Sequence, residues 1–87
     1  MNADEMMYEL GFKKVSLASF EVILTYRCLT ENEIWTVYFL KWYGVVHYMV
    51  SYSRRFETDG KWEKMDAKVD VELHKAIHQV LLEHGWL

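Results

Sequence analysis

Residues 33–52 of this chain read EIWTVYFLKWYGVVHYMVSY, and the predicted architecture is built around this stretch. It is rich in β-branched and aromatic residues, which favour strands, and Gly44 interrupts it near the middle. We therefore predict two antiparallel strands, Glu33–Trp42 and Val45–Phe56, joined by a short turn at Tyr43 and Gly44.

The same region has the length and the low charge of a membrane span, because Lys41 is the only formal charge between Ile34 and Ser53. Lys41 and His47 lie near the middle of that run, where polar groups are costly in a bilayer. Residues 1–5 are polar and acidic, unlike a secretory signal. We therefore expect a cytoplasmic protein with no membrane partner.

Two further strands are predicted on either side of this hairpin, over Ser19–Leu29 and Lys61–Val69. Residues 31–32, Glu-Asn, supply the turn before the hairpin, and residues 59–60, Asp-Gly, supply the turn after it. Asp-Gly is a strong signal for a type I′ turn, in which both central residues need positive φ. The four strands then form a meander, since consecutive strands joined by short turns pair with each other.

The three turns set the register of all four strands, and residues directly opposite each other share a face. The pairs predicted on one face are Cys28–Trp35, Tyr26–Val37, Leu24–Phe39, Phe39–Tyr48, Val37–Val50, Trp35–Tyr52, Tyr52–Ala67, Val50–Val69 and Arg54–Met65. This face is almost wholly apolar, and a slip of one residue in any turn would mix polar with apolar side chains. We therefore predict that it forms the core.

Helices are predicted at both ends of the chain, and each is closed by a glycine that an aromatic residue follows. The first spans Ala3–Leu10, with Asn2 or Asp4 as its N-cap. The second begins after Asp70, its N-cap, carries an apolar stripe at helical spacing, and ends at Gly85.

These elements make one α+β domain over residues 1–87: helix, four-stranded antiparallel β-meander, helix, with both helices packed on one face of the sheet. The net charge of −3 argues against a general DNA-coating protein. A single cysteine, Cys28, excludes an internal disulfide and a four-cysteine zinc site. We expect Cys28 to be a small buried hydrophobe rather than a reactive thiol.

The face opposite the core, which we call the open face, has an apolar centre and a polar rim that includes Glu21. The residues that we expect to bind a partner are Ile23, Tyr38, Leu40, Trp42, His47 and Met49. Such a patch exceeds the roughly 300–600 Å² of apolar surface that a monomer usually exposes. We therefore predict a small protein–protein interaction module that forms a homodimer through the open face.

The alternative function is a single-stranded nucleic-acid binder. Its predicted contact residues are Arg54, Arg55, Trp62 and Lys64, which combine basic charge with an aromatic ring on the third hairpin. The same residues are also typical of an ordinary strand edge, where basic side chains prevent pairing with other chains. Acidic neighbours offset the charge, so nucleic acid is the less favoured partner.

His74 and His78 are four residues apart on the second predicted helix, which is the spacing of two imidazoles that bind one zinc ion. A structural zinc site needs four ligands. Asp70 lies one turn earlier on the same side of the helix, and either His47 or another chain could complete the site. The alternative is a solvated helix face, and we predict no metal and no cofactor. The chain contains no G-x-S-x-G, no phosphate-binding glycine loop and no H-E-x-x-H motif, so we do not expect an enzyme.

The two ends of the chain also carry a resemblance. The residues concerned are Glu9-Leu10-Gly11-Phe12, Glu72-Leu73, Ala76-Ile77, Gln79 and Gly85-Trp86. They resemble the pattern ELGF, ELxxAIxxQ, LGW of small uncharacterised proteins from phages and prophages of Gram-positive bacteria, except that His84 stands where Leu is usual. The resemblance implies an intracellular phage accessory protein with a host protein as a candidate partner, and it implies no particular activity.

Overall fold

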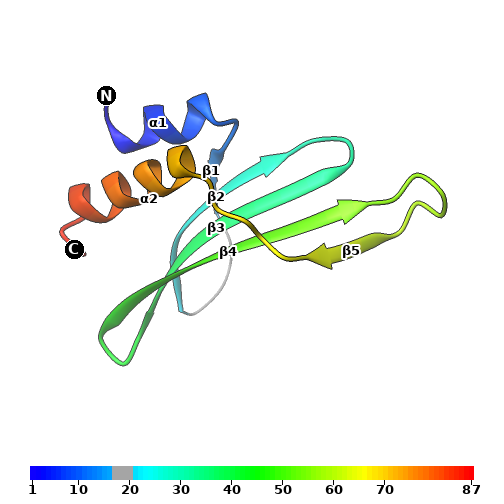
Figure 1. Ribbon diagram of the computed structural model, residues 1–87. Helices are drawn as coiled ribbons and strands as arrows, with labels where there is room; N and C mark the ends of the chain where they lie inside the picture. The colour runs from blue at the N-terminus through cyan, green and yellow to red at the C-terminus, as the bar shows by residue number, and fades with distance from the viewer. Residues whose placement is uncertain (17–20) are drawn as a thin grey trace.

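A computed structural model, which describes residues 1–16 and 21–87, forms two helices and a five-stranded antiparallel sheet (Figure 1). The elements are α1 (Ala3–Glu9), β1 (Lys13–Val15), β2 (Val22–Leu29), β3 (Glu33–Trp42), β4 (Val45–Arg55), β5 (Trp62–Met65) and α2 (Val71–Glu83). The strands lie in chain order, so the α+β class and the antiparallel meander order are confirmed, but the sheet has five strands and not the predicted four. Within the described residues, neither helix is long and apolar enough to cross a membrane.

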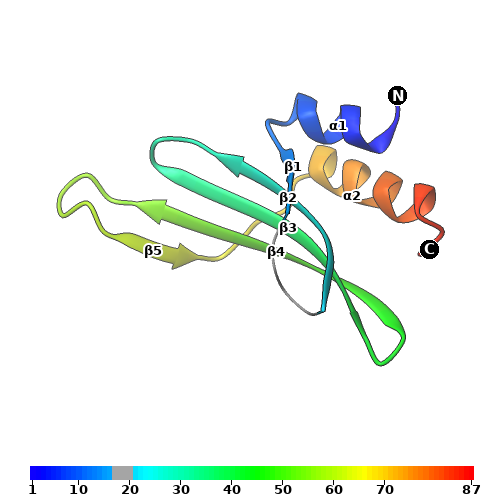
Figure 2. The same ribbon diagram turned by 180° about the vertical axis from the view of Figure 1, so that it is seen from behind.

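Both helices pack on the same face of the sheet and enclose the core with it (Figures 1 and 2). The sheet contributes Tyr26, Val37 and Phe39, which alternate along β2 and β3 as the predicted core face requires. The buried helix residues are Ala3, Met7, Leu73, Ala76, Ile77 and Val80. The helices therefore lie on the apolar face that the register predicts, but they cover only part of it, since Tyr48 and Met65 on the same face are 44% and 38% exposed.

Capping residues set where the helices begin. Asn2, rather than Asp4, is the N-cap of α1, and it forms a capping box with Glu5. Asp70 is the N-cap of α2, and its side chain accepts a hydrogen bond from a backbone N–H of the first turn. Gly85 follows the last residues of α2 with a φ of 68°, the left-handed conformation that closes a helix.

The first two hairpins have the predicted registers. The pairs observed are Cys28–Trp35, Tyr26–Val37, Leu24–Phe39, Phe39–Tyr48, Val37–Val50 and Trp35–Tyr52. Between β3 and β4, Tyr43 and Gly44 have φ values of 50° and 74°. Two successive left-handed residues are the mark of a type I′ turn, whose twist matches that of the strands it joins.

The register of the third hairpin differs from the prediction. The predicted pairs Tyr52–Ala67, Val50–Val69 and Arg54–Met65 are wrong. Tyr52 lies opposite Met65 and Arg54 lies opposite Glu63, which is a shift of two residues. Because side chains alternate with a period of two, the shift leaves each side chain on its predicted face. The register shift also shortens the last strand, which ends at Met65. Among the described residues, Val50 therefore has no strand on its outer side.

The cause of the shift is the connection between β4 and β5. The N–H of Phe56 donates to the carbonyl of Lys61, so four residues, 57–60, form the loop in place of the predicted two. Gly60 has a φ of 68°, but Asp59 is not left-handed. Instead, the Asp59 carboxylate accepts the N–H of Lys61 at 2.9 Å. An Asp side chain that bonds the backbone two residues on favours this longer loop.

β2 differs from the prediction in two respects, its outer partner strand and the register near its start. At its outer edge it pairs with β1, a fifth strand whose sequence, Lys-Lys-Val, lacks the alternation of a buried strand. Toward its start the register shifts between Val22 and Leu24, so Ile23 is the extra residue of a β-bulge. Residues 19–20, where the predicted strand begins, lie outside the described residues.

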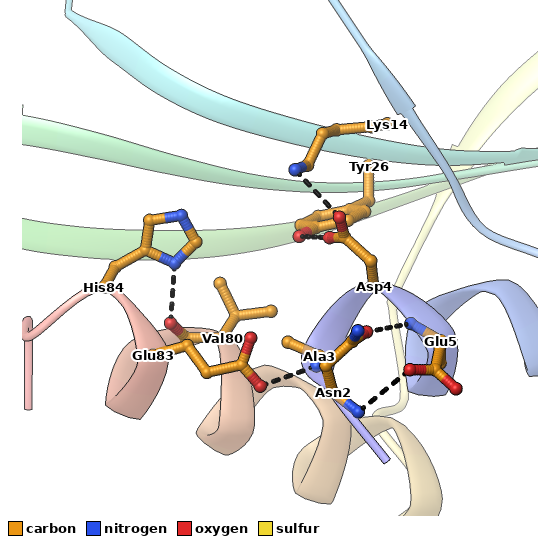
Figure 3. Close-up of polar contacts among 9 residues, drawn as sticks. All are labelled: Asn2, Ala3, Asp4, Glu5, Lys14, Tyr26, Val80, Glu83 and His84. Carbon is orange, nitrogen blue, oxygen red and sulfur yellow. Dashed lines mark hydrogen bonds and ion pairs between the residues drawn. The ribbon is translucent and has the colours of Figure 1, made fainter.

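The Asp4 carboxylate joins α1 to the sheet (Figure 3). It accepts the Tyr26 hydroxyl at 2.7 Å and the Lys14 ammonium at 3.0 Å. The Tyr26 hydrogen bond and then the Lys14 hydrogen bond hold the pKa of Asp4 below its ordinary 3.8, while burial and the Asp4 hydrogen bond raise the pKa of Tyr26. Glu83 of α2 in turn accepts the N–H of Ala3 at 2.7 Å. The start of α1 is therefore tied to both the sheet and α2.

The substitution Tyr26→Phe removes the hydroxyl and keeps the ring in the core. We expect it to lower the free energy of unfolding at neutral pH by about 1 kcal/mol, since the Asp4 carboxylate is partly exposed and forgoes one charge-assisted hydrogen bond. The pKa of Asp4 is lower in the folded protein than its ordinary value of 3.8. The ionised carboxylate therefore contributes to the free energy of unfolding above pH 3.8, and this contribution is lost as the pH falls through the pKa of Asp4 in the folded protein. Urea unfolding of both proteins at neutral and at acid pH measures the effect. If the two proteins differed in free energy of unfolding by the same amount at acid pH as at neutral pH, the prediction would be wrong.

Candidate functional site

No helix of the described residues covers the open face, as two opposite views make plain (Figures 1 and 2). The register arranges its side chains in rows across the strands. The three rows nearest the turn between β3 and β4 pair Trp42 with Val45, Leu40 with His47, and Tyr38 with Met49. We call these six residues, together with Val22 and Ile23 of β2, the apolar half of the open face.

Large side chains of the apolar half are exposed to solvent. Trp42, Val45 and Met49 keep 53%, 55% and 51% of their surface accessible. The indole of Trp42 lies 5.4 Å from the ring of Tyr43 and 6.4 Å from that of His47, measured between centroids. Clustered aromatic and Met side chains are what the cores of protein interfaces prefer.

The structure brings the six predicted partner residues together. Five of them alternate along the adjoining strands β3 and β4 and occupy five of the six positions in the three rows described above, the sixth being Val45. Ile23, at the bulge of β2, is 44% exposed and follows Val22, which lies opposite Leu40. The period-two alternation of two neighbouring strands therefore places five of the six predicted partner residues on one surface.

The bulge corrects the prediction for Glu21, which was expected at the rim of the open face. Beyond the bulge β2 is offset by one residue, so the carbonyl of Glu21 accepts the N–H of Lys41 at 3.0 Å and Val22 lies opposite Leu40. Glu21 thereby shares the helix side of the sheet with Lys41. The open face is left without the one acidic residue that the sequence assigned to it.

The other end of the open face is basic. Lys13, Arg27, Arg55 and Lys64 occupy its strand positions, with hydroxyl side chains of β3 and β4 between them. Among the described strand residues, no carboxylate lies on this face. Arg55 and Glu31 approach to 3.9 Å at the rim, and an exposed pair at that distance contributes little. We call these four residues, with Trp62, the basic half.

The four residues of the predicted nucleic-acid surface do not share one face. Arg55 pairs with Trp62 and its guanidinium lies 5.9 Å from the indole centroid, while Lys64 lies on the same side two residues further along β5. Arg54 projects to the helix side of the sheet, where its guanidinium lies 5.7 Å from the ring of Phe56. Adjacent residues of a strand alternate between faces, so the sequence contained the signal that separates Arg54 from the other three.

His74 and His78 lie on the flank of α2 that faces β4, where they border a cavity of about 340 Å³ with Tyr48. His47 projects from the opposite face of the sheet, and the Asp70 carboxylate accepts a backbone N–H as the cap of α2. Neither suggested third ligand therefore joins the pair. The part of the chain that the structure describes contains no group of three or more His, Cys, Asp or Glu residues placed to hold a metal ion.

Cys28 is half-buried on the helix side and borders a cavity of about 230 Å³. Burial raises the pKa of its thiol above 9.0, with a further contribution from Glu33. A thiol that is protonated at neutral pH is a poor nucleophile. The side chain also limits its neighbour, since a Cβ at Gly11 would lie 3.2 Å from the sulfur. Cys28 therefore acts in packing.

Sequence reasoning missed a groove on the helix side. Trp35 and Tyr52, predicted as core residues, stack with their ring centroids 4.3 Å apart and remain half-buried. They border a cavity of about 500 Å³, which adjoins the cavity at Cys28 through Trp35 and Lys68. The pairing of the two rings was predictable, but the extent of the helix cover over them was not.

Comparison with protein-family models, with curated proteins and with solved structures finds no match to this chain.

Proposed function

We propose that this protein is a small interaction module that binds a second copy of itself through the apolar half of the open face. The proposal rests on one observation: Trp42, Val45 and Met49 lie exposed and adjacent on a sheet face that neither helix covers. Removing such side chains from water contributes about 25 cal/mol per Å² of apolar area. A second copy supplies a surface of the same kind.

The distribution of charge is compatible with stacking of two copies. The basic half lies at the far end of the open face from Trp42. Suppose that the open faces of two copies stack on each other at their apolar halves, related by a two-fold axis that runs across the strands. The basic half of each copy then extends in the opposite direction from that of the other copy. Like charges then do not meet in the interface, where they would oppose association.

The resemblance to phage and prophage proteins extends this proposal. A host protein is a second partner for the same surface, and the function would then be to block or redirect that partner. Binding, rather than catalysis, is the activity that we propose.

Leu40→Glu places a carboxylate at the centre of the apolar half. We expect it to halve the mass of the oligomer and to leave the helix content unchanged, because a buried unpaired charge is costly at an interface while no helix packs on this face. Native mass spectrometry and far-UV circular dichroism measure the two quantities. Lys41→Glu introduces the same side chain on the other face of the same strand, and it should keep the parent mass. An oligomer of unchanged mass in Leu40→Glu would refute the proposed interface.

The basic half favours a second candidate function, the binding of single-stranded nucleic acid. Its charged side chains are all basic, and the Arg55 guanidinium lies beside the indole of Trp62. Bases stack on such rings while cations contact the phosphates. Because the basic half and the apolar half occupy different ends of the face, the two functions can coexist.

Arg54 and Arg55 provide a matched test, since they are adjacent in β4 and lie on opposite faces. We expect Arg55→Ala to reduce the slope of log affinity against log salt concentration by roughly 0.7 for each phosphate that the variant no longer neutralises, and Arg54→Ala to leave the slope unchanged. Fluorescence anisotropy of a labelled oligothymidine, titrated at several salt concentrations, gives both slopes. Equal effects of the two substitutions would assign the affinity to general charge rather than to the open face.

A further inference from the structure

The outer edge of β4 is unpaired over more than half of its length. β4 runs from Val45 to Arg55, and β5 pairs only with its last part, Tyr52–Arg55. Residues 45–51, with the sequence VVHYMVS, therefore have no strand on their outer side among the described residues. We call this stretch the free edge.

The direction of the backbone groups along the free edge follows from two hydrogen bonds. The N–H of Arg55 donates to Asn32 on the β3 side at 2.8 Å, and the N–H of Phe56 donates to Lys61 on the β5 side at 3.2 Å. The direction of the backbone N–H and C=O groups alternates from residue to residue along a strand. The backbone groups of the even-numbered residues of β4 therefore point outward, away from β3. The residues that present N–H and C=O groups at the free edge are Val46, Tyr48 and Val50.

The free edge lacks the features that normally prevent a strand from pairing with another chain. Natural edges are blocked by charged side chains, proline or bulges. β1 carries Lys13 and Lys14, and β5 carries Glu63 and Lys64. The free edge contains no charged residue and no proline, and its register with β3 is regular throughout.

We propose that the free edge pairs antiparallel with the free edge of a second copy, about a two-fold axis at Tyr48, to form one continuous sheet. In this register the outward residues meet only outward residues: Val46 meets Val50 of the other copy and Tyr48 meets its equivalent. Each of the three residues then donates one hydrogen bond and accepts one. His47 meets Met49 on the open face, so the stretch pairs with itself without a charge conflict.

The cavity between α2 and β4 supports a second copy as the occupant of the free edge. It measures about 340 Å³ and is bordered by Tyr48, His74, Ile77, His78, Leu81 and Leu87. Because both copies keep their helices on the same side of a continuous sheet, the two α2 flanks face each other across the axis. None of the side chains that border the cavity is a carboxylate, a lysine or an arginine.

This contact is independent of the open-face interface proposed above. It uses the outward backbone groups of the free edge, whereas the open-face interface uses side chains, and only the side chains of His47 and Met49 border both contacts. Different substitutions therefore disrupt the two contacts, and the failure of one proposal leaves the other intact.

Amide hydrogen exchange of the unmodified protein, followed by NMR, tests the edge contact without a substitution. The amides of Val46, Tyr48 and Val50 should exchange at least about tenfold more slowly in a concentrated sample, where the pairing forms, than after dilution to the monomer. The amides of His47 and Met49 donate toward β3 and should be protected in both samples. Fast exchange at the three outward amides in a sample that native mass spectrometry reports as an oligomer would overturn the proposal. A protein that remains monomeric in the concentrated sample would do so as well.

Two substitutions complete the test. Val46→Pro removes an outward N–H that takes no part in the pairing with β3, and we expect it to halve the mass of the oligomer; Val46→Thr keeps that N–H and should keep the mass. If Val46→Pro loses its helix content, Tyr48→Lys serves in its place, because it sets two ammonium groups opposite each other across the axis.

A double variant that combines the edge substitution with Leu40→Glu separates the two contacts. It should be a monomer, and an edge variant that retains the parent mass would refute the edge pairing alone.

Discussion

The turn at Tyr43 and Gly44 sets the register on which the rest of the molecule depends. A left-handed conformation costs a non-glycine residue about 1–2 kcal/mol, and Tyr43 adopts it at the tip of the longest hairpin. The continuous pairing of β3 with β4 from Glu33 to Trp42 offsets this cost. If the register moved by one residue, Val37 would leave the core for the open face. The division of the sheet into a covered face and an open face follows from this turn.

The helix layer is smaller than the sheet that it covers. At about 1.5 Å per residue α2 is roughly 20 Å long, whereas β4, at about 3.3 Å per residue, extends to roughly 36 Å. The contacts of Asp4 with Tyr26 and Lys14 hold the helices over one end of the sheet. The stacked rings of Trp35 and Tyr52 therefore border a groove, and the hairpin of β4 and β5 extends beyond the helices (Figure 1).

Interaction surfaces arise from the same mismatch. Both helices pack on one face, so no described helix covers the apolar half of the other face, although Thr25 and Thr36 on that other face are buried. Among the described residues, the short β5 leaves most of β4 without a strand on its outer side. The bulge at Ile23 adds a third effect, because it turns Glu21 away from the open face, where every charged side chain of the described strands is basic. The two helices, the short β5 and the bulge in β2 therefore determine both how the core packs and which surfaces remain available to a partner.

Much of the candidate site follows from the alternation of side chains along a strand. Tyr38, Leu40 and Trp42 share a face in any straight strand that contains them, and the turn pairs them with Met49, His47 and Val45. The same rule separates Arg54 from Arg55. The removal of Glu21 from this face does not follow from the rule, because a bulge breaks the alternation and nothing near Ile23 in the sequence marks it.

The start of α2 at Asp70, two of the three turns and the apolar face of the sheet follow from the sequence alone, because each depends on residues that are close along the chain. For α1 the sequence left Asn2 and Asp4 open as the N-cap, and the structure has Asn2. Three features depend on contacts between distant parts of the chain: Lys13–Val15 forms a strand, β2 carries a bulge, and β5 ends at Met65. A Lys-Lys-Val segment has no preference of its own for a strand and takes its conformation from the edge of β2. The lengths and partners of edge strands depend on what the neighbouring strand offers, and that information lies outside the segment itself.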